Sequence, residues 1–212
     1  MAMNYTLGNT TRPRLHGRPL VPVQPATYPY PPIGPLCCEH EGEWTIAPDG
    51  AIEQLAVLPA GAATNDWLGF KATWDFGQMD LAEISVNITV PDINPNMIAG
   101  LTLALEDERH FMEMEIYQSE FGLYLTRWPE VTEFITCWQV PIPTPVAGTA
   151  YTMKATVRGQ AITGLLTLGG VEVAPLQSYL GARTKGTRFG LYNARDAARP
   201  NCPRFSSLNV KV

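Results

Sequence analysis

Residues 110–128 read HFMEMEIYQSEFGLYLTRW and carry the clearest secondary-structure pattern of the chain. Apolar side chains at 112, 114 and 116 alternate with Glu, Glu and Tyr at 113, 115 and 117. Since successive side chains of a strand point to opposite faces of a sheet, the alternation predicts a half-buried strand. SEFG at 119–122 is typical of a tight turn, and FGLYLTRW at 121–128 then predicts a returning strand. The stretch therefore predicts an antiparallel hairpin.

The period of two continues through most of the remaining chain. Further strands are predicted at 68–74, 84–90, 133–140, 151–159, 161–170, 188–194 and 205–212. Turn signals rich in Pro, Asp, Asn and Gly separate them, at 48–50, 91–96, 106–109 and 141–149. No window of twelve residues has helical periodicity. Many short strands joined by turns predict an all-β fold for residues 41–212, an antiparallel two-sheet jelly-roll sandwich.

Composition narrows the class of protein. The chain has 212 residues, of which 45% are hydrophobic and 17% charged. This much apolar material offsets the entropy of ordering a backbone, which excludes a wholly disordered chain. No window approaches the roughly eighteen uninterrupted apolar residues of a membrane-spanning helix, so we expect no membrane insertion.

The charge is unevenly distributed. The whole chain carries −5, whereas residues 1–38 hold three arginines and no acid, so residues 39–212 carry −8. Affinity for nucleic acid comes mainly from Lys and Arg that displace counterions from phosphates. We therefore expect no nucleic-acid partner for the acidic body.

Residues 1–40 differ in composition from the rest of the chain, and this composition predicts an extended proline-rich arm. Eight of the nineteen prolines lie between 13 and 35. Proline fixes φ and removes a backbone donor, so neither a helix nor a central strand fits there. Apolar side chains are interspersed, which predicts docking onto the body or, preferably, onto a neighbouring subunit of an oligomer. The side chains expected to make these contacts are Arg12, Arg14, Arg18, Tyr28 and Tyr30.

The first nineteen residues, MAMNYTLGNTTRPRLHGRP, contain no apolar segment after their charges. They do not resemble a signal peptide, and we expect a product made in the cytoplasm.

The cysteines do not have the spacing of a zinc site. Cys37 and Cys38 are adjacent, and Cys137 and Cys202 stand alone. Two disulfides that join Cys37 and Cys38 to Cys137 and Cys202 are possible by number. Buried free thiols are the preferred interpretation.

The order of five segments along the chain is more informative about the fold family than the period-two alternation within them. They are GEWTIAPDGAIEQ, DFGQMDLAEISVNITV, IAGLTLALEDERHFMEMEIYQSEFGLYLTRW, AYTMKATVRGQAITGLLTLGGVEV and GTRFGLYNARDAARPNCPRFSSLNVKV. Over residues 42–212 this order resembles the concanavalin A-like lectin/glucanase superfamily, in its laminin G-like and glycosidase-associated branches. The matching residues are Trp44, Gly50, Gly100, Leu101, Asp107, Phe111, Tyr151, Lys154, Gly159, Gly170, Gly186, Gly190, Leu191, Tyr192, Phe205, Leu208 and Val210. The resemblance implies a concanavalin A-like jelly roll and, since one fold serves many functions, no particular activity.

The resemblance also sets an expectation about catalysis. Glycosidases of this superfamily carry E-x-D-x-E or E-x-D-x-x-E on one strand, whereas this chain has Glu113-Met-Glu115-Ile-Tyr117. We expect the two glutamates to form the solvated outer face of a half-buried strand and the protein not to be an enzyme. Glycoside hydrolysis at Glu113 and Glu115 is the alternative, because adjacent carboxylates could form an acid/base pair. No Ser-His-Asp or Cys-His array is legible in the sequence.

Polar and aromatic side chains suggest a sugar-binding face. If residues 119–122 turn a hairpin, the side chains at 113, 115 and 117 share a face with those at 124, 126 and 128. Aromatic rings cover the C–H surfaces of a sugar and carboxylates bind its hydroxyls. Packing beneath a loop or the arm is an equally good interpretation. The candidate carbohydrate-binding residues are Glu113, Glu115, Tyr117, Tyr124 and Trp128, extended by Phe134 and Trp138, together with a loop of Asn193, Arg195 and Asp196 at a position where related lectins contact sugar.

No cofactor is expected. Related modules often carry a structural calcium, and Asp75, Asp80, Asp92, Asn94 and Asp107 lie in predicted turns. Turn-capping is the ordinary role of such residues, so no metal ligand is assigned.

Three functions follow. The first is a non-catalytic, lectin-like component of a large assembly, such as a bacteriophage tail or capsid surface, anchored through residues 1–38 and able to bind a cell-surface glycan. The second is a free-standing carbohydrate-binding or glycan-hydrolysing protein, and the third is a module that contacts only other proteins.

Overall fold

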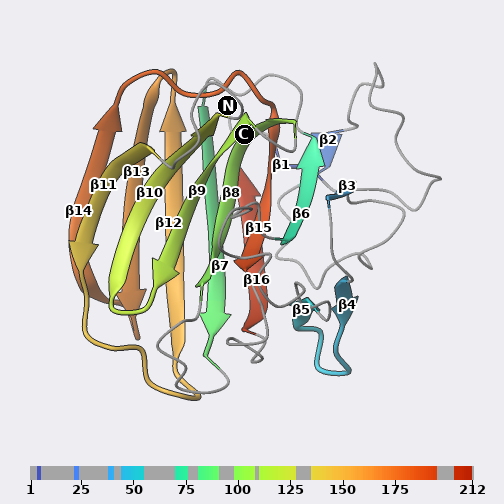
Figure 1. Cartoon of the computed structure of the whole chain (residues 1–212). Coiled ribbons are helices and arrows are strands. Elements are labelled where there is room, and N and C mark those ends of the chain that lie inside the picture. The colour runs from blue at the N-terminus through green and yellow to red at the C-terminus, as the bar shows by residue number, and fades with distance from the viewer. Residues whose placement is uncertain are drawn as a thin grey trace, which may run out of the picture.

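The computed structural model describes residues 4–5, 22–23, 38–40, 44–54, 70–75, 81–90, 98–107, 110–127, 135–194 and 203–211. Two seven-stranded antiparallel sheets face each other in a sandwich (Figure 1). Within the described ranges there is no helix, and hence none long and apolar enough to cross a membrane. The predicted all-β jelly-roll sandwich is confirmed.

The first sheet contains the 110–127 hairpin next to its edge strand β11 (Ile135–Pro141). Its spatial order is β11-β10-β9-β8-β15-β6-β3. The strands are β3 (Cys38–His40), β6 (Phe70–Asp75), β8 (Ile98–Asp107), β9 (His110–Tyr117), β10 (Glu120–Arg127), β11 (Ile135–Pro141) and β15 (Arg188–Ala194).

The second sheet has the order β14-β13-β12-β7-β16-β5-β4. Its strands are β4 (Trp44–Ile46), β5 (Ile52–Gln54), β7 (Leu81–Thr89), β12 (Ala150–Arg158), β13 (Ala161–Leu168), β14 (Val171–Leu180) and β16 (Arg204–Lys211). Two short strands, β1 (Asn4–Tyr5) and β2 (Pro22–Val23), pair with each other. Of the predicted arm, β3 pairs with the edge of the first sheet through β6.

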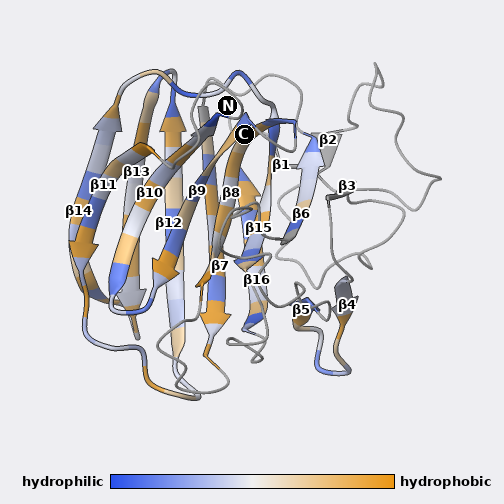
Figure 2. Cartoon of the chain, viewed as in Figure 1, coloured by the Kyte–Doolittle hydropathy of each residue, from blue (hydrophilic) through white to orange (hydrophobic). Residues whose placement is uncertain are grey.

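The core lies between the inner faces of the two sheets. Met112, Met114 and Ile116 of β9 are completely buried, as are Ile84 and Val86 of β7. Figure 2 shows the consequence along the arrows, where hydrophobic and hydrophilic residues alternate on most strands. Burial of these side chains at about 1.5–3 kcal/mol each holds the sheets together.

The last strand returns to the sheet that holds the first strands of the body. β16 pairs with β5 and β7, and the ring of Phe205 lies 6.1 Å from that of Trp44. Arg204 adds two ion pairs of 2.6 Å, from Nη2 to Asp49 and from Nε to Glu53. The β4–β5 hairpin is thereby tied to the end of the chain.

The predicted strands omit β14, as well as β8 and the short β3, β4 and β5. β14 follows β13 after the Gly169-Gly170 turn, in which both glycines have positive φ. Its alternation is obscured by Pro175 and by register shifts opposite residues 164–167 of β13. These irregularities are tolerated because β14 lies at the edge of its sheet.

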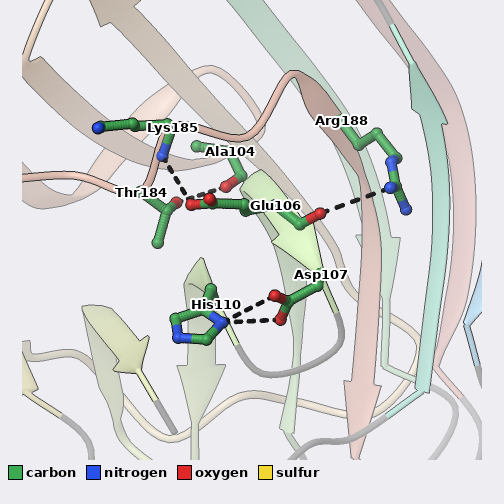
Figure 3. A network of polar contacts seen from close by, with 7 residues as sticks. All are labelled: Ala104, Glu106, Asp107, His110, Thr184, Lys185 and Arg188. Carbon is green, nitrogen blue, oxygen red and sulfur yellow. Dashed lines mark hydrogen bonds and ion pairs between the residues drawn. The ribbon is translucent and has the colours of Figure 1, made fainter. Parts of the chain in front are cut away.

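A polar network holds the end of β8 against the segment before β15 (Figure 3). Ala104 has a φ of 49° at a bulge in β8, and its carbonyl accepts a hydrogen bond from the Thr184 hydroxyl. Glu106 accepts from the backbone N–H of Lys185 at 3.3 Å. His110 Nδ1 lies 2.9 Å from the Asp107 carboxylate across the β8–β9 hairpin. The network fixes the geometry of the strands that carry the site.

Candidate functional site

The outer face of the first sheet, which points away from the second sheet, carries the predicted glutamates. On β9, Glu113 pairs with Thr102 of β8 and with Tyr124 of β10. Glu115 pairs with two glycines, Gly100 and Gly122. The hairpin register therefore places both carboxylates and Tyr124 on the same face, as the alternation in the sequence predicts.

The expectation that this face is solvated is wrong. Glu113 is 1% exposed and Glu115 is 7% exposed. A second hydrophobic cluster lies on the same face, separate from the core between the sheets; it comprises Ile98, Leu105, Phe111, Tyr192 and Ala194, with Tyr117 packed against it. Period-two alternation cannot reveal this, because it separates two faces without showing what covers the outer one.

Lys71 is a further residue of this face, one that the sequence pattern does not reveal. It lies on β6, is 1% exposed, and its Nζ is 4.2 Å from the centroid of the Phe111 ring and 5.7 Å from that of Tyr192. Rings attract a cation through their negative faces, which offsets part of the loss of hydration. In the sequence Lys71 alternates with apolar neighbours and has the pattern of a solvent-facing residue, so burial is the only signal that identifies it.

The electrostatics of Glu113 follow from this burial. Removal from water raises the pKa of Glu113 to about 8, against the lowering effects of the Lys71 charge and of a hydrogen bond from Tyr192. Its Oε2 atom is buried with no hydrogen-bond partner. A neutral carboxyl group at physiological pH beside a second carboxylate is the arrangement that the alternative of acid/base chemistry would need.

We expect Glu113 to make stability fall as the pH rises. Its ordinary pKa is 4.5, and between 4.5 and about 8 the unfolded chain releases the proton while the folded chain keeps it. The stabilisation is therefore complete below the ordinary pKa and lost by about pH 8. Urea unfolding at pH 5, 6.5 and 8 should show a steeper decline for the wild type than for Glu113→Gln. An equal decline of the free energy of unfolding with pH in both proteins would contradict the burial of the Glu113 carboxyl group.

Tyr124 lies flat on the sheet. Gly122 makes room for it, since a Cβ atom at Gly122 would stand 2.5 Å from the Tyr124 hydroxyl and 2.6 Å from its ring. Burial, followed by the charge of Glu115, raises the pKa of Tyr124, so the phenol stays neutral. Gly122 thus allows an aromatic ring to lie beside the Glu115 carboxylate.

The face becomes more accessible toward β11. Tyr117 and Glu120 at the β9–β10 turn are half-buried, and Thr136 and Gln139 of β11 are exposed. Thr136 pairs with Tyr124, and Gln139 pairs with Gly122. We call this part, over β9, β10 and β11, the Tyr124 face. It joins a ring, carboxylates, a hydroxyl and an amide within three strands.

Two other expected residues lie elsewhere. Trp138 packs in the core, with its ring 4.9 Å from that of Phe121, so it does not extend the face. Asn193, a candidate of the sugar-contacting loop, lies within β15, in agreement with the strand predicted at 188–194. Asn193 is 1% exposed, and its Nδ2 donates to the Ile98 carbonyl at 2.8 Å, which is a structural role.

Several candidates lie outside the described residues. They are Trp128, Phe134, Arg195 and Asp196 of the candidate sugar site, Arg12, Arg14, Arg18, Tyr28 and Tyr30 of the arm, and Asp80, Asp92, Asn94, Cys37 and Cys202.

The metal and cysteine candidates that are described have other partners. Asp75 accepts a hydrogen bond of 2.7 Å from Thr187, and Asp107 pairs with His110. No group of three or more His, Cys, Asp or Glu side chains is gathered in the described part of the chain. Cys137 is a half-buried free thiol, and burial raises its pKa to about 11.

Comparison with known proteins gives structural matches only. No family model matches, and no curated protein matches. The carbohydrate-binding module CBM66 from Bacillus subtilis is similar in structure, with a TM-score of 0.57 and 13% identity over 83% of this chain and 95% of that one.

Two larger proteins contain a similar sandwich. A xylan β-1,4-xylosidase from Bacillus halodurans matches with a TM-score of 0.56 and 12% identity, over 77% of this chain and 33% of that one. The binding domain of botulinum neurotoxin serotype D matches with a TM-score of 0.53 and 8% identity, over 82% of this chain and 43% of that one. This chain thus spans a third of the length of the xylosidase and less than half of the length of the neurotoxin domain. At such identities the comparisons show the fold, a carbohydrate-binding-module-like jelly roll of two antiparallel sheets.

Proposed function

We propose that this protein is a non-catalytic carbohydrate-binding sandwich that holds a sugar on the Tyr124 face. The observation that carries the proposal is the placement of Tyr124, lying over Gly122 beside Glu115, at the border between the buried cluster and the exposed side chains of β11. A ring at such a border covers sugar C–H groups, while the half-buried Glu120 and the exposed Gln139 offer oxygens and an amide to hydroxyl groups.

The structural relatives support this choice over a purely protein-binding module. CBM66 is a carbohydrate-binding module and is matched over nearly its whole length. The xylosidase acts on a polysaccharide, although the similar part is only a third of it. Fold alone assigns no function, so the proposal depends on the side chains of the face.

Tyr124 gives the direct test. Tyr124→Ala removes the ring and should abolish retention on a glycan array, whereas Tyr124→Phe keeps the ring and should retain binding within about threefold. Lys185→Gln, at an exposed position that the proposed face does not include, is the control. Undiminished binding by Tyr124→Ala and by Trp128→Ala would remove the proposal.

Glycoside hydrolysis is the second candidate, and the burial of Glu113 favours it. A protonated Glu113 beside the carboxyl group of Glu115 on one face would supply an acid and a second carboxyl group. We nevertheless propose no enzymatic activity, because Tyr117 stands where the glycosidases of the superfamily have the last carboxylate of their catalytic row. Incubation with β-glucans, arabinogalactan and peptidoglycan should release no reducing ends. Release that Glu115→Gln abolishes would reverse this assignment.

We also propose that the protein belongs to a larger assembly, such as a virion, and is anchored through residues 1–38. The support is the composition of that segment, rich in proline and arginine and free of acids. Deletion of residues 1–38 should leave a folded sandwich but prevent incorporation into the assembly. Normal incorporation of the truncated chain would show that the segment is not an anchor.

A further inference from the structure

A groove lies on the other side of the molecule, on the outer face of the second sheet. Its volume is about 370 Å³, and it crosses β7, β12, β13 and β14. The lining residues are Glu83, Lys154, Thr156, Arg158, Ala161, Thr163, Leu165 and Leu176. None of them belongs to the Tyr124 face, so the groove is a separate feature of the fold.

Hydroxyl groups form the middle of the groove. Thr156 pairs with Glu83 on one side and with Thr163 on the other, and Thr163 pairs in turn with Ser178. Adjacent strands are about 4.8 Å apart, so this polar row runs about 14 Å across four strands. A row of this length presents hydrogen-bonding groups to an extended ligand lying across the strands.

Cations flank the row. Lys154 and Arg158 lie two residues before and after Thr156 on β12, which places them about 13 Å apart along the strand. Arg158 is exposed and has no ion-pair partner among the described residues. The groove therefore holds one guanidinium group that is not neutralised.

The carboxylate in the groove does not cancel this charge. Lys154 Nζ lies 2.8 Å from one oxygen of Glu83, and Lys211 Nζ lies 3.2 Å from the other. The two lysines hold the pKa of Glu83 below its ordinary value, so Glu83 is ionised and balances one of them. The charged residues of the lining, Lys154, Arg158 and Glu83, leave one positive charge, and Lys211, which pairs with Glu83 from outside the lining, adds a second. The chain as a whole carries −5.

An apolar side completes the groove. Leu165 of β13 is half-buried and Leu176 of β14 is 58% exposed. A polyuronate chain has hydroxyl groups, carboxylates and C–H ring surface, and so complements the threonines, the cations and the leucines together. The arginine-rich N-terminal segment is not a suitable occupant, because residues 1–38 have the same sign of charge as the groove.

We propose that this groove is a second carbohydrate site, which binds acidic polysaccharide of the polyuronate class. Arg158 and Lys154 bind the carboxylates, Thr156 and Thr163 bind hydroxyl groups, and Leu165 and Leu176 contact the sugar rings. The site is independent of the Tyr124 face, and it extends the proposed function by naming a charged substrate class.

The test compares polygalacturonate with its methyl ester, which has the same backbone without the charges, by calorimetric titration of the full chain. Wild-type protein should bind the acid form at least tenfold more tightly than the ester, and added salt should weaken the binding, because charge-assisted contacts carry it. Arg158→Gln should weaken binding about tenfold. Lys185→Gln removes the same charge at an exposed position outside the groove and should leave the affinity within about twofold.

Several outcomes would overturn the proposal: no binding of polygalacturonate, equal affinity for the ester, an equal loss in Lys185→Gln, or tighter binding of a poly-glutamate peptide than of the polysaccharide. Thermal unfolding of each variant checks that the sandwich is intact. Tyr124→Ala separates the two sites, since it should leave polygalacturonate binding unchanged. If neutral glycans fail to bind but Arg158→Gln still weakens polygalacturonate binding, the groove is confirmed as a binding site and the proposal for the Tyr124 face is wrong.

Discussion

Replacing Lys71 by methionine is expected to lower the free energy of unfolding by about 3 kcal/mol at pH 8.5. Lys71 is 1% exposed and lies against the Phe111 and Tyr192 rings, where its charge lowers the pKa of the buried Glu113. Above about pH 8 the wild-type carboxyl group ionises beside this cation. In Lys71→Met it has no such compensation, so folding must keep the group protonated at a cost that grows with pH.

Two comparisons make this prediction specific. At pH 6 the loss in Lys71→Met should be smaller, because Glu113 is already neutral in the wild type. The double variant Lys71→Met/Glu113→Gln should lose less stability at pH 8.5 than Lys71→Met alone, since the side chain at position 113 can then carry no charge that needs compensation. Urea unfolding at the two pH values measures all of these differences.

Lys211→Met is the matched control for the removal of a lysine. Lys211 is 51% exposed and pairs with Glu83 at the surface. Its removal should cost less than about 1 kcal/mol and show little pH dependence. Equal losses in Lys71→Met and Lys211→Met at both pH values would mean that the Lys71–Glu113 pair contributes nothing to the stability of the fold.

Gly190→Ala is expected to destabilise the protein by about 3 kcal/mol. Gly190 lies within β15 and pairs with Thr73 of β6. A Cβ atom at this position would collide with the backbone of Ala72 and Thr73, which cannot move aside as a flexible side chain could. Because β15 lies between β6 and β8, relief of the collision would separate strands in the middle of the first sheet.

Gly148→Ala is the control for this substitution. A Cβ atom at Gly148 meets nothing within 4 Å, but the residue has a φ of +73°. Only the cost of the left-handed backbone applies, about 1 kcal/mol. Thermal unfolding of both variants, with far-UV circular dichroism of the folded state, measures the difference. A loss in Gly190→Ala no larger than in Gly148→Ala would show that the strands accommodate the methyl group.

The sequence predicts the sheets well wherever one face of a strand is buried and the other is polar. β15 spans the expected residues 188–194, and β9 and β10 form the hairpin expected from residues 110–128. In such strands the register is fixed by side-chain chemistry, since a slip of one residue would move every apolar group to the wrong face. β14 carries no such pattern, and the sequence does not reveal it.

The candidate site is predictable only in part. Alternation places Glu113, Glu115 and Tyr124 together, because the hairpin between them is short. It does not find Lys71 or Tyr192, which reach the same face from strands far away in the sequence. The pairing of β15 with β6 and β8 brings them there.

An acidic, all-β, two-sheet sandwich follows from the amino-acid sequence alone, and so does the set of side chains of each strand that share a face. The burial of the outer face of the first sheet around Lys71 and Glu113, and the positive charge of the groove on the second sheet, become visible in the folded protein. Periodicity separates the two faces of a single strand, whereas burial and electrostatic environment depend on contacts between distant strands.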